Sequence, residues 1–154
     1  GEDKSINQFV TFTLGDEEYG ISIIRVQEII RYQQPTRVPQ TSECLEGVLN
    51  LRGRVIPVVN LRQRFGLSEN ERDRATRIVV VEVHEQVIGL VVDSVREVRN
   101  IEKERIDPPP PMGTSIDSKF IHGMGKLEDQ LVILLVVDEI FDPNESMQMA
   151  EIAA

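Results

Sequence analysis

The chain has 154 residues, of which 40% are hydrophobic, and a formal net charge of −9 at pH 7. This length suffices for one globular domain of ordinary size, or for two small units that share an interface. An acidic chain is a poor general ligand for nucleic acids and anionic membranes, because those surfaces are bound through a surplus of Lys and Arg. We therefore predict no nucleic-acid partner. Membrane insertion is not expected either, since the longest apolar run, at 131–137, is far shorter than the roughly 20 residues of a spanning helix.

Cysteine usage and the N-terminal sequence indicate the compartment. Cys44 is the only cysteine, so no internal disulfide can form, and no early stretch shows the basic and then apolar pattern of a signal peptide. We predict a cytoplasmic protein.

Short strands bounded by turn residues are predicted from the start of the chain. The alternating run "FVTFTL" at 9–14 is followed by the turn "GDEE" and by "YGISIIRVQEII" at 19–30. Two further apolar runs form the hairpin sequence "GVLNLRGRVIPVVNL" at 47–61. A short helix is expected at 60–67, where Gly66 acts as a stop signal.

The second half continues the series. The runs "IVVVEV" at 78–83, "IGLVVDSVREVR" at 88–99 and "LVILLVV" at 131–137 all resemble strands. The prolines at 108–111 predict a rigid connector, although such a run also resembles a ligand for an aromatic-lined groove. A short terminal helix can begin at Asn144, directly after Pro143.

An internal repeat organises these strands. Residues 19–30 align without gaps to 88–99 at an offset of 69, and 47–59 align to 123–135 at an offset of 76. Two matches in the same order indicate a duplication. Each copy then holds about five short strands, which is typical of a small antiparallel barrel.

We therefore predict a mainly all-β protein made of two tandem barrels packed on each other. The first barrel is expected at 9–76 and the second at 77–143, with a tail or short helix at 144–154 within a single domain of 1–154. The first strand either stays with its own barrel or completes the other one, and the sequence leaves both arrangements open.

The hairpin at 47–61 shows how copies of one structure can differ in charge. Four apolar residues are expected to face the barrel interior, namely Leu49, Leu51, Val55 and Val59. Gly53 supplies the positive φ of the turn, and Asp129 takes its place in the second copy. Asn50 and Arg52 are expected to point outward, and Arg52 and Arg54 stand where the second copy has Glu128 and Gln130. A requirement of the fold would affect both copies alike, so this divergence favours a partner that contacts only one half.

Reactive groups are scarce. His84 and His122 are the only histidines and fit no metal-binding spacing, so we expect no metal and no cofactor. Cys44 has no adjacent base, and the ten glycines form no phosphate-binding loop. A non-enzymatic protein that binds other proteins is favoured, with a small-molecule-binding or catalytic β-barrel as the alternative.

The segments "FVTFTLGDEEYGISIIRVQEII", "GVLNLRGRVIPVVNLRQRFG" and "IGLVVDSVREV" together resemble the CheW family of bacterial chemotaxis coupling proteins. The resemblance runs from about Phe9 to Asp142. It implies SH3-like barrels and an adaptor that links the cytoplasmic tip of a chemoreceptor to the regulatory domain of the histidine kinase CheA. A cytoplasmic location with recruitment to membrane receptor arrays would follow.

The resemblance also implies roles for particular residues. The positions attributed to receptor binding in the family match Val26, Glu28, Gly47, Arg52 and Val98. For the kinase surface we expect strand ends near Arg77 and Val95. Glu28 and Gly47 recur in the second copy as Glu97 and Gly123, which favours a structural role for both, and Val26 and Val98 can equally be core residues. Arg52 has no basic counterpart and is therefore the strongest candidate.

Overall fold

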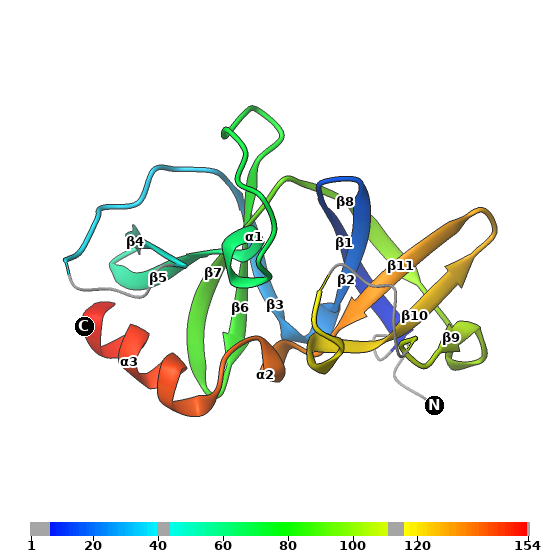
Figure 1. Ribbon diagram of the computed structural model, residues 1–154. Coiled ribbons are helices and arrows are strands. Elements are labelled where there is room, and N and C mark those ends of the chain that lie inside the picture. Colours follow the sequence, from blue (N-terminus) through cyan, green and yellow to red (C-terminus); the bar gives the residue numbers. More distant parts are fainter. Residues whose placement is uncertain (1–6, 40–43, 111–115, 154) are drawn as a thin grey trace.

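The computed structural model of the chain describes residues 7–39, 44–110 and 116–153. Two β-sheets lie side by side, and the helices α1 (Leu61–Arg64) and α2 (Val137–Ile140) lie near the middle of the molecule (Figure 1). The predicted all-β class with paired SH3-like barrels is confirmed.

A six-stranded sheet forms one half of the molecule, in the order β8-β1-β2-β11-β10-β9. Its strands are β1 (Gln8–Leu14), β2 (Glu17–Ser22), β8 (Ser94–Asn100), β9 (Ile106–Asp107), β10 (Ile121–Leu127) and β11 (Gln130–Leu135). A five-stranded sheet forms the other half, in the order β3-β6-β7-β5-β4. Its strands are β3 (Val26–Arg31), β4 (Leu45–Leu51), β5 (Arg54–Asn60), β6 (Arg77–Val83) and β7 (Gln86–Val92).

Each sheet combines strands from both copies of the repeat. β1 and β2 join the later strands β8 to β11, whereas β6 and β7 join the earlier strands β3 to β5. The exchange therefore involves the first two strands of each copy, and both sheets cross the boundary between residues 76 and 77.

The two sheets share one pairing scheme, as expected for a duplication. In each, a hairpin (β1–β2 or β6–β7) pairs antiparallel with the third strand of the other copy through its first strand. The second strand of the hairpin pairs parallel with the last strand of that copy, β11 on β2 and β5 on β7. Each of these parallel pairs joins strands from different copies of the repeat.

Three apolar clusters hold the structure together. A small cluster including Ile56, Val58 and Val80 fills the five-stranded barrel, and another including Phe9, Ile101 and Leu134 fills the six-stranded barrel. The largest cluster lies between the sheets and receives side chains from β1, β2, β6 and β7, among them Tyr19 and Leu90. Most of the buried apolar surface therefore belongs to the interface between the barrels.

The β4–β5 hairpin corrects two sequence predictions about interior residues. Leu49 is buried in the barrel interior and Leu51 packs against it, as expected. Val55, however, is 41% exposed, and Val59 belongs to the cluster between the sheets. The register explains this, because Leu49 pairs with Ile56, so the alternate residues of β5 point to the outer face.

The turn of the β10–β11 hairpin corrects a third prediction. The residue with positive φ is Glu128, at 36°, and not Asp129. Its counterpart in the β4–β5 turn is Arg52, with φ of 51°, which precedes Gly53 at 86°. The two turns therefore share a left-handed residue at the same aligned position.

Short helical segments complete the chain. The 3-10 turns η2 (Ile23–Arg25), η3 (Lys103–Arg105) and η4 (Ser118–Phe120) accompany α1, α2 and α3 (Pro143–Ala153). Asn60 caps α1 by accepting a hydrogen bond from the Gln63 amide, and Gly66 follows with φ of 75°. α3 lies against β5 and β7 of the five-stranded sheet (Figure 1). The proline run ends at Pro111, outside the described residues, and Pro108–Pro110 belong to no helix or strand.

Candidate partner-binding surfaces

Arg52 and Glu28 form an ion pair that connects the two edges of the five-stranded sheet. Arg52 lies in the β4–β5 turn and Glu28 lies on β3, and an Arg52 Nη2 donates to Glu28 Oε2. The Arg52 side chain is 72% exposed, so the pair leaves most of the guanidinium accessible. Of the five residues expected to bind the receptor, these two are joined by a direct side-chain contact.

Gly47 has a structural role that its position on β4 makes evident. A Cβ atom added at Gly47 would lie 2.2 Å from the carbonyl oxygen of Thr36. Thr36 and Val48 exchange two backbone hydrogen bonds of 2.9 Å, which bring the chain after β3 across β4. Gly123 occupies the same place in the other barrel, where a Cβ would lie 2.8 Å from the Asp107 carbonyl oxygen. Both barrels need glycine here for backbone approach.

Val26 and Val95 are equivalent residues of the two copies. Val26 opens β3 and Val95 lies near the start of β8, and both are half-buried side chains packed against the cluster between the sheets. Sequence reasoning assigned Val26 to the receptor surface and Val95 to the kinase surface. Their shared packing shows that each has a role in the fold.

Val98 differs from the two valines just described because its side chain points outward. It lies on β8 in the six-stranded sheet and is 49% exposed. Its counterpart on β3 is Ile29, which is also exposed. Val98 therefore belongs to the barrel opposite to the one that carries Arg52, Glu28 and Gly47.

The Arg77 side chain forms hydrogen bonds to nearby backbone groups. It lies at the start of β6, and its Nη1 donates to the carbonyl oxygens of Arg74 and Thr76, at 2.7 and 3.0 Å. Arg77 and Val95 lie in different sheets, so the strand ends expected to bind the kinase do not form one continuous strand surface.

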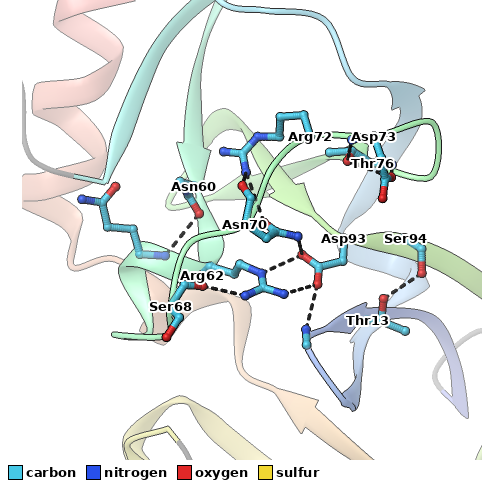
Figure 2. A network of polar contacts seen from close by, with 12 residues as sticks. Thr13, Asn60, Arg62, Ser68, Asn70, Arg72, Asp73, Thr76, Asp93 and Ser94 are labelled. Carbon is cyan, nitrogen blue, oxygen red and sulfur yellow. Dashed lines mark hydrogen bonds and ion pairs between the residues drawn. The ribbon is translucent and has the colours of Figure 1, made fainter.

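The most connected polar cluster lies where the chain crosses from β7 to β8. Figure 2 shows the Arg62 guanidinium facing the Asp93 carboxylate, with Nε–Oδ1 and Nη2–Oδ2 distances of 2.8 and 2.5 Å. The Gly15 amide in the β1–β2 turn donates to Asp93 Oδ2 at 2.8 Å, and Asn70 Nδ2 donates to Oδ1 at 3.3 Å. Both charged side chains are less than one-fifth exposed.

The electrostatics of this cluster follow from its geometry. Burial alone would raise the pKa of the Asp93 carboxyl, but hydrogen bonds from Arg62 and Gly15 outweigh burial and lower the pKa below its ordinary value. The hydrogen bond to Asp93 in turn raises the pKa of Arg62. The pair is therefore charged at neutral pH.

A second cluster lies at the other crossing, from β2 to β3. Arg25 forms a bidentate pair with Asp138 of α2, with an Nη1–Oδ2 distance of 3.0 Å, and donates to the Glu82 carbonyl oxygen at 2.9 Å. His84 Nε2 bonds the carbonyl oxygens of Asp138 and Phe141 at 2.9 and 2.8 Å. The hydrogen bond from Arg25 lowers the pKa of Asp138.

Sequence reasoning missed both clusters, although a signal was present. Arg62 and Asp138 are separated by 76 residues, the offset of the second repeat match, and carry opposite charges. Arg25 and Asp93 lie next to aligned positions of the first match and again carry opposite charges. A comparison of charges at aligned positions would have singled out Arg62 and Asp138, one residue of each cluster.

Pockets and ligating groups bear on the alternative of a ligand-binding or catalytic barrel. One pocket has a volume of about 580 Å³ and is lined by polar side chains including Tyr32, Glu46 and Arg72. The carboxyls with lowered pKa, Asp93 and Asp138, lie outside it. Among the described residues, no three His, Cys, Asp or Glu side chains are grouped as metal ligands. In the same part of the chain, no helix has the length and apolar character needed to cross a membrane.

Comparison with known proteins identifies the family. The model of the CheW-like domain matches residues 8–145. This chain belongs to the CheW-like family. It is 35% identical to the chemotaxis protein CheW of Klebsiella aerogenes over 146 residues, which cover 95% of this chain and 88% of that protein. It is 39% identical to the chemotaxis protein CheW of Helicobacter pylori over 139 residues, or 90% of this chain and 84% of that protein.

A solved structure supports the same assignment. The crystal structure of the scaffolding protein TtCheW from Thermoanaerobacter tengcongensis superposes with a TM-score of 0.82 at 39% identity, and the match covers 90% of each chain. The resemblance found in the sequence is thus confirmed. The CheW-like family, its chemotaxis relatives and the scaffold structure support an adaptor role in chemotaxis signalling.

Proposed function

We propose that the chain links the cytoplasmic tip of a chemoreceptor to the regulatory domain of the histidine kinase CheA, without catalysing a reaction itself. An adaptor with two separate surfaces raises the effective concentration of one partner near the other, so no new chemistry is needed. The membership in the CheW-like family carries this proposal. A cytoplasmic location at receptor arrays belongs to the same proposal.

For the receptor surface, we infer that Arg52 and Val98 make direct contacts. Arg52 presents a largely exposed guanidinium, which suits a charge-assisted hydrogen bond to a partner, and Val98 presents an exposed apolar side chain. Glu28 orients Arg52 through the ion pair. Val26 and Gly47 have a supporting structural role: Val26 packs against the cluster between the sheets, and Gly47 allows the backbone at Thr36 to lie close to β4.

For the kinase surface, the strand ends near Arg77 and Val95 remain our candidates. They lie at the start of β6 and near the start of β8, in different sheets. A kinase domain that binds there would contact both barrels at once. Binding on a surface apart from Arg52 would leave the receptor contact free.

The test is a three-component binding assay. The protein is mixed with a receptor signalling fragment and a CheA fragment, and formation of a ternary complex is measured together with kinase autophosphorylation. We expect a ternary complex in which autophosphorylation depends on the receptor, while the protein alone neither hydrolyses ATP nor transfers phosphate. Displacement of CheA in proportion to receptor occupancy would show that the sites overlap, and the bridging function would then be rejected.

A further inference from the structure

Two polar clusters occupy equivalent places at the two crossings between the sheets. The Asp93 clamp consists of Asp93, Arg62 and Gly15, and the Asp138 clamp consists of Asp138, Arg25 and His84. Arg62 and Asp138 are related by the offset of 76 residues, and Gly15 and His84 by the offset of 69. The clamps are therefore related by the duplication.

The same three structural elements meet in each clamp. One group comes from the crossing itself, Asp93 between β7 and β8 or Arg25 between β2 and β3. A second comes from the short helix after the last strand of a copy, α1 or α2. The third comes from the hairpin turn of the opposite sheet, β1–β2 or β6–β7. Each clamp thus ties the five-stranded sheet to the six-stranded sheet.

The charges of the two clamps are reversed. In the Asp93 clamp the helix supplies Arg62 and the crossing supplies the carboxylate, whereas in the Asp138 clamp the helix supplies the carboxylate and the crossing supplies Arg25. Both pairs are bidentate. Both crossings therefore have an ion pair, but the positive and negative partners are exchanged. This indicates that the connection between the sheets is important, and that the element which carries each charge is not.

Apolar packing and the clamps contribute differently to the interface. Burial of apolar surface between the sheets is large but has no preferred direction, so it stabilises contact more than one particular orientation. A bidentate guanidinium–carboxylate pair has a fixed planar geometry and constrains the groups that carry it. Partly buried ion pairs can contribute such specificity even where their net contribution to stability is small.

We propose that Arg62, Asp93, Arg25 and Asp138 are positioning residues that fix the orientation of one barrel relative to the other. Arg52 lies on one barrel and Val98 on the other, so this orientation sets the geometry in which partners meet the adaptor. That consequence rests on the proposed function, while the positioning of the barrels does not.

The first experiment measures the orientation without any partner. Spin labels are placed on Arg31→Cys in β3 and Glu104→Cys in η3, both exposed sites, in a Cys44→Ala background, and the distance distribution is measured by double electron–electron resonance. We expect one narrow distribution in the parent and a clearly broader or shifted one in the Arg62→Gln/Arg25→Gln variant. The control Lys126→Gln removes an exposed ion pair with Asp107, which joins two strands of the same sheet, and should leave the distribution unchanged.

A conservative variant keeps the proposal testable if the double glutamine variant does not fold. Arg62→Lys/Arg25→Lys retains both charges but loses the bidentate geometry, so it should also broaden the distribution. If the folded variants keep a distribution with the same width and the same mean distance as that of the parent, apolar packing alone fixes the orientation and the proposal is wrong.

The second experiment measures coupling. Binary affinities for a receptor fragment and for a CheA fragment are compared with the affinity of ternary assembly. We expect the clamp variants to weaken receptor binding, CheA binding and ternary assembly by about tenfold each, because both proposed surfaces contain residues of both barrels, whereas Lys126→Gln should leave all three unchanged. Equal ternary assembly by parent and clamp variants would contradict the functional consequence. If the parent itself binds only one partner, the proposed function fails, and the distance measurement still decides the role of the clamps.

Discussion

At the tip of the β4–β5 hairpin, Asn50 and Gly53 form the turn and Arg52 presents a charged side chain. Asn50 Oδ1 accepts a hydrogen bond of 2.8 Å from the Gly53 amide, which stabilises the turn. Arg52 adopts a left-handed conformation and directs its side chain toward Glu28. The equivalent turn of the other barrel places Glu128 in the same conformation, while Glu97, the counterpart of Glu28, pairs with Arg99. The same backbone therefore carries opposite charges on the two barrels.

Reversing the charge of Arg52 should weaken receptor binding without unfolding the protein. Arg52→Glu places two carboxylates side by side and removes a donor from the proposed surface, so receptor affinity should fall by about 1 to 3 kcal/mol. Thermal stability should change little, because exposed ion pairs contribute about 0 to 1 kcal/mol. Calorimetric titration with a receptor fragment measures the first effect and thermal denaturation the second. The matched control is Glu128→Arg, which makes the opposite change at the equivalent turn. A loss of stability with unchanged affinity would assign Arg52 to the fold instead.

Replacing Gly47 should damage the fold itself. A Cβ at this position would collide with the backbone of Thr36, and the residue has φ of 153°, so Gly47→Ala should destabilise the protein by about 1 to 3 kcal/mol. Gly53→Ala is the control: it also has positive φ, but its Cβ would meet no atom within 4 Å, so its cost should be smaller. Urea denaturation compares the two. Equal stability of both variants would exclude backbone approach as the reason for glycine at 47.

At the scale of elements, one aspartate at each crossing between the sheets contacts the neighbouring short segments. Asp93 accepts hydrogen bonds from α1 and from the β1–β2 turn, and its own amide donates to the Thr13 carbonyl oxygen at 3.0 Å. Asp138 pairs with η2, and its backbone carbonyl accepts from His84 in the β6–β7 turn. These segments are too short to be stable on their own, so their placement depends on such contacts.

The clamps predict a loss of stability in acid. Asp93 and Asp138 have folded-state pKa values below the ordinary one, so their contribution to stability is fully present above pH 4 or so and is lost as the pH falls through the folded pKa. Asp93→Asn should cost about 2 kcal/mol at pH 7, and the difference from the parent should shrink below pH 4. Denaturation at pH 7 and pH 3 measures this effect. Asp107→Asn, in an exposed ion pair, should show little difference at either pH. A cost for Asp93→Asn that is equal at both pH values would contradict the assignment.

The sequence predicted elements better than it predicted their partners. Alternating apolar residues and turn signals located the strands, because these patterns depend on neighbours in the chain. The interior face of β5 was assigned to the wrong alternate residues, because the register depends on the turn. Ile56, paired with Leu49, faces the interior, so Val55 is exposed and Val59 lies at the interface between the sheets. The Arg62–Asp93 pair joins residues 31 positions apart, and no local pattern marks such a contact. The repeat offset marks only one residue of each pair, because Arg62 aligns with Asp138, which carries the opposite charge.

At the scale of the whole molecule, the interface between the barrels is the principal core. The cluster between the sheets contains Phe12, Tyr19 and Phe65, whose rings follow one another at centroid distances of 5.9 and 6.2 Å. By contrast, the barrel interiors hold much smaller clusters. Units of about 70 residues bury little apolar surface by themselves, so neither barrel has an adequate core without the other. Each barrel also contains strands from both halves of the chain, so neither half can complete a barrel alone.

Dividing the chain should therefore give two fragments that fold only together. A break between Ser68 and Glu69, in the exposed segment before β6, separates β1 to β5 from β6 to β11. The first fragment then lacks β8 to β11 of one sheet and β6 and β7 of the other, and the second fragment lacks β1 and β2 of one sheet and β3 to β5 of the other. Each fragment also lacks one side of the central cluster. We expect residues 1–68 and 69–154 to be unfolded separately by circular dichroism and to form a folded heterodimer when mixed. The control is the intact chain with a protease site at the same position, which should stay folded after cleavage. If either fragment gives a cooperative unfolding transition alone, that half can build a barrel from its own strands, and the exchange would not be essential for folding.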